Sequence, residues 1–341
     1  MSLRQITISL CLVLLGIAPL AAISQGSLLF LTFEPGGRAN GMGRAYSAVA
    51  DDAYAMWWNP GATAFNRKGQ LALNHIPWLQ GSGINDMFYE YLGWNQYFEG
   101  IGNLNAHVVL LDAGTQEQTD SSGLPLGTFH SFDIAGAVGY SYEVIPAKLG
   151  LGANFKLIYS YLAPATGFTD SEGKAFSFGF DIGAKYLDVA DIEGLDMALV
   201  LQNLGPDVTF VDNEQADPSP MTLRLAAAFE LINNPINKML FSVEASKMLA
   251  NDDPLLKRFI TGWEYMDETI FGVGAEYTYL QLLSLRGGYF LDAVGEVTGP
   301  SFGAGINYTF SERYKLNVDF SMVPAGELTD FNKVFSIGFE Y

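Results

Sequence analysis

The sequence predicts an all-β protein: an outer-membrane antiparallel β-barrel of about 14 strands with an N-terminal plug or hatch in its lumen. Three observations predict this class. The chain opens with an apparent export signal, it is hydrophobic and aromatic but poor in charge, and its later segments alternate apolar with polar or small residues. The predicted domains are a signal peptide at 1–24, a plug segment with a short helix at 25–68 and a barrel at 69–341.

The first 24 residues have the three parts of a secretory signal peptide. Arg4 supplies the positive start, an apolar core follows at 6–20, and small residues precede the expected cleavage site. An uncleaved anchor helix is the alternative, although the apolar core is short for one. Cys11, the single cysteine, lies inside this core, so we expect no disulfide in the mature chain. We also predict no metal site and no cofactor.

The composition favours a protein that is partly solvated by lipid. Lys and Arg total 18 against 37 Asp and Glu, and the net charge of −19 argues against nucleic acid as a partner. Yet charged residues make up only 16% of the chain against 49% hydrophobic residues, which is unusual for an acidic soluble protein. After the signal, no stretch approaches the roughly 20 continuous apolar residues of a membrane helix. Entry into a membrane is therefore expected through strands.

The segment 149–161 shows the period-two pattern most clearly, with apolar residues on one face and Gly, Asn, Lys and Ser on the other. A soluble β-sandwich also alternates, but this apolar face is unbroken and aromatic near its ends, which is typical of a lipid-facing wall. The opposite face mixes glycine with isolated charges that can pair inside a lumen. The predicted lumen charges are Asp133, Lys156, Asp181, Lys185, Arg224, Glu244, Glu276, Arg286 and Asp319.

The connections between strands alternate in length, as the short turns and long external loops of outer-membrane barrels do. The predicted strands start near residues 69, 88, 101, 131, 148, 175, 196, 221, 239, 269, 283, 301, 315 and 333. The predicted long loops are 112–130, 163–174, 205–220 and 249–268. Within the last, 259–267 could form a strand, but an odd strand number would break the alternation. This phase places both termini in the periplasm of a diderm bacterium.

The stretch before the first strand carries the signals of a compact insert. The G-x-G at 41–43 is not a dinucleotide loop, because Tyr46 stands where the third glycine would fall and no strand precedes it. The double aspartate at 51–52 suits the start of a short helix, and the Asn-Pro-Gly turn at 59–61 suits its end. A barrel of about 14 strands encloses more space than its own side chains fill. We therefore predict that this mini-helix lies inside as a plug.

The same stretch, GGRANGMGRAYSAVADDAYAMWWNPGATAF, resembles the N-terminal signature of the PorV/PorQ family, which is similar to the FadL long-chain fatty-acid transporters. The shared features are a G-M-G-like element, a D-D-A element and an aromatic-N-P turn, although alanine commonly follows the proline where this chain has Gly61. The resemblance implies an outer-membrane barrel with a hatch in its lumen. The candidate plug or gate residues are Arg38, Gly41, Met42, Gly43, Asp51, Asp52, Trp57, Trp58, Asn59 and Pro60.

We expect the two aspartates of this stretch to pair with lumen cations such as Lys156, Lys185 or Arg286, and its tryptophans to pack the lumen floor. A gate and a purely structural plug both fit this arrangement. Apolar side chains in the loops could contact ligands or cargo, or could simply anchor the loops. These are Leu124, Leu126, Phe168, Phe210, Leu255 and Leu256.

The resemblance leaves two function classes open. A PorV-like barrel would be an accessory of type IX secretion that handles secreted cargo at the cell surface, with a secretion translocon and cargo proteins as partners. A FadL-like barrel would carry long-chain fatty acids or other hydrophobic small molecules. Either would lie among outer-membrane lipid and lipopolysaccharide, and the hatch argues against a diffusion porin. An enzyme is not expected, because H-E-x-x-H is missing and His75, His107 and His130 are interpreted as girdle or loop residues.

Overall fold

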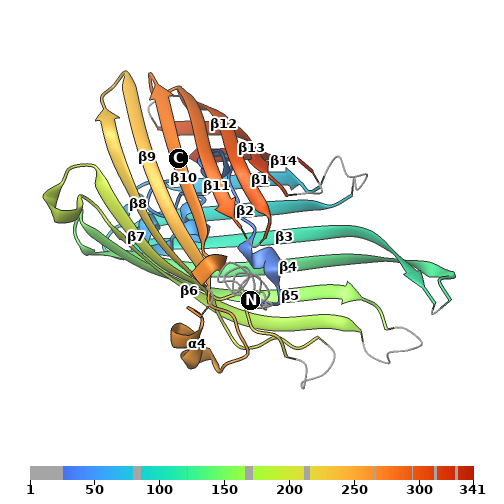
Figure 1. The fold of residues 1–341 in the computed structure, drawn as a ribbon. Helices are drawn as coiled ribbons and strands as arrows, with labels where there is room; N and C mark the ends of the chain where they lie inside the picture. The colour runs from blue at the N-terminus through green and yellow to red at the C-terminus, as the bar shows by residue number, and fades with distance from the viewer. Residues whose placement is uncertain are drawn as a thin grey trace, which may run out of the picture.

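The computed structural model describes residues 26–79, 86–120, 122–165, 172–210, 216–264, 266–293, 295–310, 313–326 and 329–341. In this part of the chain, fourteen strands follow one another around a closed antiparallel barrel (Figure 1). β1 (Gln70–Pro77) pairs with both β2 (Phe88–Phe98) and β14 (Phe331–Glu340), which closes the wall. The predicted all-β antiparallel barrel and its strand number are confirmed, and the predicted signal peptide lies outside the described residues.

Most strands begin within two residues of their predicted starts; β4 and β12 begin earlier. The short connections, such as the one between β8 and β9, lie at the same end as the C-terminal Tyr341; we call this the turn end and the opposite end the loop end. The remaining strands are β3 (Gly102–Thr119), β4 (Pro125–Ile145), β5 (Leu149–Ala163), β6 (Gly173–Tyr186), β7 (Leu195–Leu204), β8 (Thr222–Asn233), β9 (Asn237–Met248), β10 (Ile270–Tyr279), β11 (Leu283–Asp292), β12 (Val297–Phe310) and β13 (Tyr314–Pro324).

Burial follows the period of two. In β5, Leu151, Phe155 and Leu157 are exposed on the outside of the wall, whereas Asn154 and Lys156 are buried on the inside. This is the reverse of a soluble barrel, whose apolar side chains face inward, and it is the pattern of a wall that lipid solvates. None of the helices in the described residues is long and apolar enough to cross a membrane.

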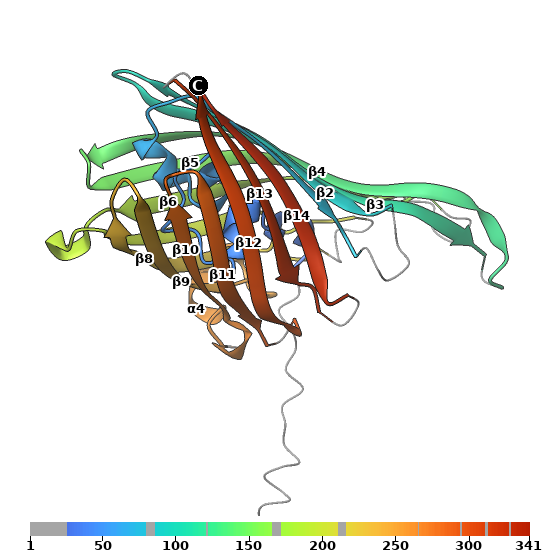
Figure 2. The ribbon, with the colours of Figure 1, turned by 90° about the horizontal axis from the view of Figure 1, so that it is seen from above.

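The predicted loop at 112–130 is wrong in most of its length, because β3 and β4 continue through it as a two-stranded ribbon. Toward the loop end, the last pair between β2 and β3 is Phe88–Asp112, and the last pair between β4 and β5 is Phe132–Tyr161. Past these pairs, in the described residues, β3 and β4 pair only with each other. Figure 2 shows this ribbon reaching past its neighbours. Both faces of such a ribbon meet water, so its strands can be polar on both sides and carry no alternation for sequence analysis to detect.

The residues before β1, which we call the N-terminal segment (26–68), form short elements: η1 (Leu29–Thr32), α2 (Gly37–Gly41), α3 (Ala55–Trp58) and η2 (Pro60–Phe65). One expectation needs correction here: the double aspartate at 51–52 precedes α3 by three residues instead of opening it. A second short helix, α2, lies in the glycine-rich part of the segment. α2 contacts β11–β14 and η2 contacts β3–β6, so the segment bridges opposite sides of the wall (Figure 1).

The long connection between β9 and β10 contains no strand among its described residues. It forms α4 (Leu255–Thr261) and the short η5 (Met266–Glu268) at the loop end. The predicted loop is therefore helical in part, and its exclusion as a strand keeps the strand number even. One further short element, η3 (Val189–Asp191), lies in the turn between β6 and β7.

Candidate functional site at the N-terminal segment

Glycines of the wall allow the Gly41–Gly43 element to approach the backbone of β10–β12. Gly43 has φ +64°, a left-handed backbone conformation that residues with a Cβ atom disfavour. A Cβ atom at Gly43 would lie 2.4 Å from the carbonyl oxygen of Val273, and one at Gly288 would lie 2.2 Å from the Gly43 nitrogen. The inward glycines of these strands therefore serve close docking of the N-terminal segment. The glycines that face it are Gly272, Gly274, Gly288 and Gly303.

A second glycine contact fixes the Asn59–Gly61 turn against β5 and β6. The Asn59 side chain accepts a hydrogen bond from the Gly61 N–H at 3.0 Å and donates one to the carbonyl of Ala184 at 3.1 Å. A Cβ atom at Gly61 would lie 2.5 Å from the carbonyl oxygen of Gly183. The departure from the alanine of the family motif is thus required by this close approach.

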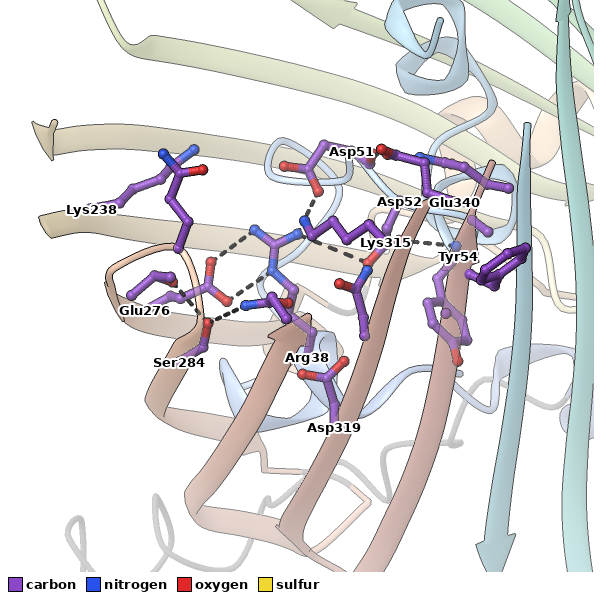
Figure 3. A pocket seen from close by; sticks show the side chains of 18 of the residues that line it. Arg38, Asp51, Asp52, Tyr54, Lys238, Glu276, Ser284, Lys315, Asp319 and Glu340 are labelled. Atoms are coloured by element: carbon purple, nitrogen blue, oxygen red, sulfur yellow. Dashed lines mark hydrogen bonds and ion pairs between the residues drawn. The ribbon is translucent and has the colours of Figure 1, made fainter. Parts of the chain in front are cut away.

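Arg38 is the centre of the polar cluster at the turn end (Figure 3). Its Nε and Nη2 atoms each donate to a carboxylate oxygen of Glu276, at 2.8 Å, which makes a bidentate pair between α2 and β10. A second ion pair joins Arg38 to Asp51, and Nη1 also donates to the Tyr46 hydroxyl at 3.1 Å. One guanidinium thereby ties two parts of the N-terminal segment to the wall.

Arg286 continues this network along the wall. It donates from Nε to Glu276 and from Nη1 to Asp319, both at 2.6 Å, so side chains of β10, β11 and β13 share one charge network. The expected pairing of the double aspartate with lumen cations is wrong: the ion pairs of Asp51 and Asp52 are made with Arg38. Arg38 was predicted as a plug or gate residue without a partner, and the fold of α2 brings it beside the two aspartates.

Asp52 adjoins this cluster and accepts two hydrogen bonds, from the Tyr46 hydroxyl at 2.7 Å and from the Tyr54 N–H at 2.9 Å. Its side chain is 20% exposed, against 52% for Asp51. Burial raises the pKa of Asp52 to about 6; Arg38 opposes the rise and the neighbouring Asp51 carboxylate adds to it. The two adjacent acids therefore differ in how readily they hold a proton.

A second charged cluster lies deeper, between the N-terminal segment and β8–β9. Arg224 pairs with Glu34 and Glu244, both at 3.0 Å, and its guanidinium stands 5.1 Å from the ring centre of Trp58. Glu244 also accepts hydrogen bonds from the backbone N–H and the hydroxyl of Ser47. The expected burial of the tryptophans is observed, because Trp57 and Trp58 are almost fully buried and edge-on to each other.

The other lumen charges hold the wall and the segment together in smaller groups. Lys156 pairs with Asp181 at 2.8 Å on β5 and β6. Lys185 donates to the carbonyl of Ala50 at 3.2 Å. Asp133 accepts a hydrogen bond from Ser160 on the neighbouring strand. All nine predicted lumen charges occupy inward positions, but in separate clusters.

Several residues of this site went unpredicted. Glu34, Arg44, Tyr46 and Ser47 all contact the clusters, and the chain offered only weak signals for them. Glu34 and Arg44 flank the glycine element, and an isolated charge in an apolar stretch could have drawn attention to each.

The histidines belong to three different settings. His107 is buried and stacks on Tyr91 with ring centres 5.7 Å apart, so its interpretation as a girdle or loop residue is wrong. The error arises because β3 places this residue on its inward face. His75 bonds to Glu90 at 2.7 Å on the outward face, and His130 lies 2.9 Å from Asp112 at the base of the ribbon.

Cavities adjoin the N-terminal segment at both ends. At the turn end, one of about 400 Å³ is polar, and its lining includes Arg38, Asp51, Lys238, Asn307, Lys315 and Glu340 (Figure 3). Toward the loop end, one of about 370 Å³ is mostly apolar, and its lining includes Leu29, Phe33, Trp78 and Val323, with Arg44 and Arg224 at its polar side. The segment thus separates a polar space from an apolar one.

Comparison with protein families gives one match. Residues 21–254, more than half of the chain, match the model of the family described as "Type IX secretion system protein PorV". A comparison with curated proteins finds no match.

Solved structures share the fold at low sequence identity. The toluene transporter TbuX of Ralstonia pickettii superimposes with a TM-score of 0.56 at 12% identity, over 90% of this chain and 98% of that one. The CymD monoaromatic hydrocarbon channel gives 0.54 at 15% identity, over 93% and 98%. A FadL homologue of Pseudomonas aeruginosa gives 0.51 at 11% identity, over 90% and 98%. At these identities the likeness concerns the barrel fold.

Proposed function

Because the chain belongs to the PorV family of type IX secretion system proteins, we propose that it is an outer-membrane accessory of type IX secretion that handles secreted cargo at the cell surface. Its partners in this proposal are a secretion translocon and cargo proteins, within a surround of outer-membrane lipid and lipopolysaccharide. The loop end faces outward from a diderm bacterium, and both termini lie in the periplasm.

The observation that carries the proposal is the contact of the N-terminal segment with both sides of the wall. α2 docks on β11–β14 while η2 docks on β3–β6, with glycines in close contact at each side and the Arg38–Glu276 ion pair on the α2 side. We infer that this segment plugs the lumen. A barrel occupied by its own chain is poorly suited to diffusion, so its outer loops become the working surface.

Within this plug, the candidate residues divide by role. Gly41, Met42 and Gly43, together with Asn59 and Pro60, act as backbone docking elements. Arg38 with Asp51 and Asp52 acts as a charged latch at the turn end, while Trp57 and Trp58 supply the apolar bulk. A gate requires the latch to open, whereas a structural plug requires it to stay closed.

A deletion strain tests the secretion role. We expect loss of the protein to leave proteins that share a C-terminal secretion domain unattached at the cell surface, with full-length protein restoring attachment. Surface proteolysis and quantitative mass spectrometry of the medium measure this. In-cell crosslinking should join the barrel to a large outer-membrane translocon subunit or to cargo. Unaltered attachment in the deletion strain contradicts the proposal.

The apolar cavity favours a second candidate, transport of long-chain fatty acids or other hydrophobic small molecules. Most of its wall is aliphatic and aromatic, as a site for a hydrophobic molecule requires. Native mass spectrometry of the protein purified in mild detergent tests this reading. A retained lipid or hydrocarbon without any protein partner would move the assignment to transport.

A further inference from the structure

α4, between β9 and β10, exposes an apolar face at the loop end. Leu256 is 81% exposed and Ile260 77%, and the rings of Phe259 and Trp263 are also exposed. The four side chains follow helical spacing at i, i+3, i+4 and i+7, so they share one face. Exposed clusters of this kind mark interaction sites in stable proteins. The exposure of Leu256 contradicts the interpretation of this residue as a loop anchor.

The helix is held rigidly from its other face. Arg258 is buried, pairs with Asp207 of the β7–β8 connection at 2.5 Å and donates to the carbonyl of Asp253 at 2.7 Å. The C-terminal end of α4 packs tightly against Leu249, because a Cβ atom at Gly262 would lie 2.8 Å from the Cα atom of Leu249. The Trp263 indole donates to the carbonyl of Phe259 at 3.0 Å. An apolar face held in place before binding loses little conformational entropy when a partner covers it.

Acidic side chains frame this face. Asp252 and Glu264 are exposed before and after the helix, and Asp207 lies beneath it. The one exposed cation of α4, Lys257, is paired with Asp253 at 2.7 Å. An anionic lipid surface would be repelled by this frame, whereas basic side chains around an apolar groove would complement it.

We propose that the face Leu256–Phe259–Ile260–Trp263 docks a polypeptide partner that offers an apolar groove framed by Lys and Arg. The proposal rests on the secretion role, and it specifies where on the barrel a secretion partner binds and by what chemistry. The aliphatic and aromatic side chains fill the groove of the partner, and the acidic side chains around α4 set the orientation of the bound partner.

Photo-crosslinking in intact cells tests the docking face. Benzoylphenylalanine placed at position 260 of the full-length protein should give a polypeptide adduct, with the attached peptide mapped by mass spectrometry to an apolar stretch flanked by Lys or Arg. Asp252→Lys with Glu264→Lys should lower the adduct yield about ten-fold, because both substitutions reverse the frame while leaving the Arg258 contacts in place. The matched control is benzoylphenylalanine at Leu124, an apolar residue beside the ribbon tip that is 63% exposed, which should not give this adduct.

Three outcomes overturn the proposal: an adduct with lipid only, an adduct with a second copy of this chain only, or a yield that charge reversal leaves unaltered. A secretion assay separates this inference from the proposed function. Leu256→Asp with Ile260→Asp should reduce cargo attachment about ten-fold or more while the barrel remains folded by gel-mobility shift on heating. Normal attachment with this variant, beside a defective deletion strain, overturns the docking face alone. A deletion strain without a defect overturns both.

Discussion

At the scale of single residues, Gly43 is the position where the docking of the N-terminal segment depends most on the absence of a side chain. Gly43→Ala should destabilise the folded protein by about 2 kcal/mol or more, because it combines a left-handed φ with a Cβ atom 2.4 Å from the Val273 carbonyl. Urea unfolding in lipid vesicles, followed by tryptophan fluorescence, measures the change.

The matched control is Gly287→Ala on β11, where an added Cβ atom meets nothing within 4 Å. It should change the free energy of unfolding by less than about 0.5 kcal/mol. Equal effects of the two substitutions would show that backbone docking of the Gly41–Gly43 element contributes nothing to stability.

Asp52 gives the molecule a stability that depends on pH. Its pKa is about 6 in the folded protein, above that of an unfolded aspartate, so the folded state binds the proton more tightly. The resulting stabilisation is fully present below about pH 4 and is lost as the pH rises through 6. We expect a decrease of about 2 kcal/mol between pH 4 and 7, measured by urea unfolding.

Asp52→Asn should flatten this pH profile, since the amide still accepts from the Tyr54 N–H but no longer titrates. The control, Asp252→Asn, replaces an exposed loop-end acid and should retain the profile of the unaltered protein. A profile for Asp52→Asn as steep as that of the control would assign the pH dependence to other groups.

The inward charges show what sequence can and cannot provide at this scale. Period two places Lys156, Arg224 and Arg286 on the inside, and the structure agrees. Their partners could not be predicted, because pairing depends on strand register and on the path of the N-terminal segment. Arg38 and Glu276 meet across 238 residues of sequence.

At the scale of elements, the latch between α2 and the loop before α3 decides whether the N-terminal segment moves. Asp51→Ala with Asp52→Ala removes two carboxylates from Arg38 and should raise single-channel conductance in planar bilayers if the segment acts as a gate. The control is Asp191→Ala in the β6–β7 turn, whose side chain is 95% exposed. Conductance near zero in both variants would identify the segment as a fixed plug.

Strand positions were accessible from sequence because lipid and lumen impose opposite demands on alternate residues. Elements outside the lipid-facing wall lack this contrast, and the sequence did not predict them. The ribbon of β3 and β4 lies beyond the paired wall, and α2 and α4 are shorter than the length over which helical periodicity is diagnostic. Their formation depends on tertiary contacts such as those of Arg38 and Arg258.

At the scale of the whole molecule, charge differs between the two ends. Beside the turn-end cavity lined by Arg38 lies a second one of about 460 Å³, and together they are lined by seven basic and seven acidic side chains, whose charges balance. The net charge of −19 therefore resides elsewhere in the chain, and the exposed acids around α4 contribute to it. Such a distribution favours basic partners at the loop end and disfavours approach by other acidic surfaces.

Completion of the fold depends on contacts between the first and the last parts of the chain. Gly37 bonds through its N–H to Ser336, 299 residues later, and Arg286 reaches its second carboxylate only in β13. These partners are far apart in sequence, and such distant contacts slow folding. A chain truncated before β13 would therefore have two defects. Its sheet would have an open edge, and the buried guanidinium of Arg286 would lack Asp319 as a partner. Premature termination would therefore leave both an unpaired strand edge in the wall and an incomplete charge network in the interior.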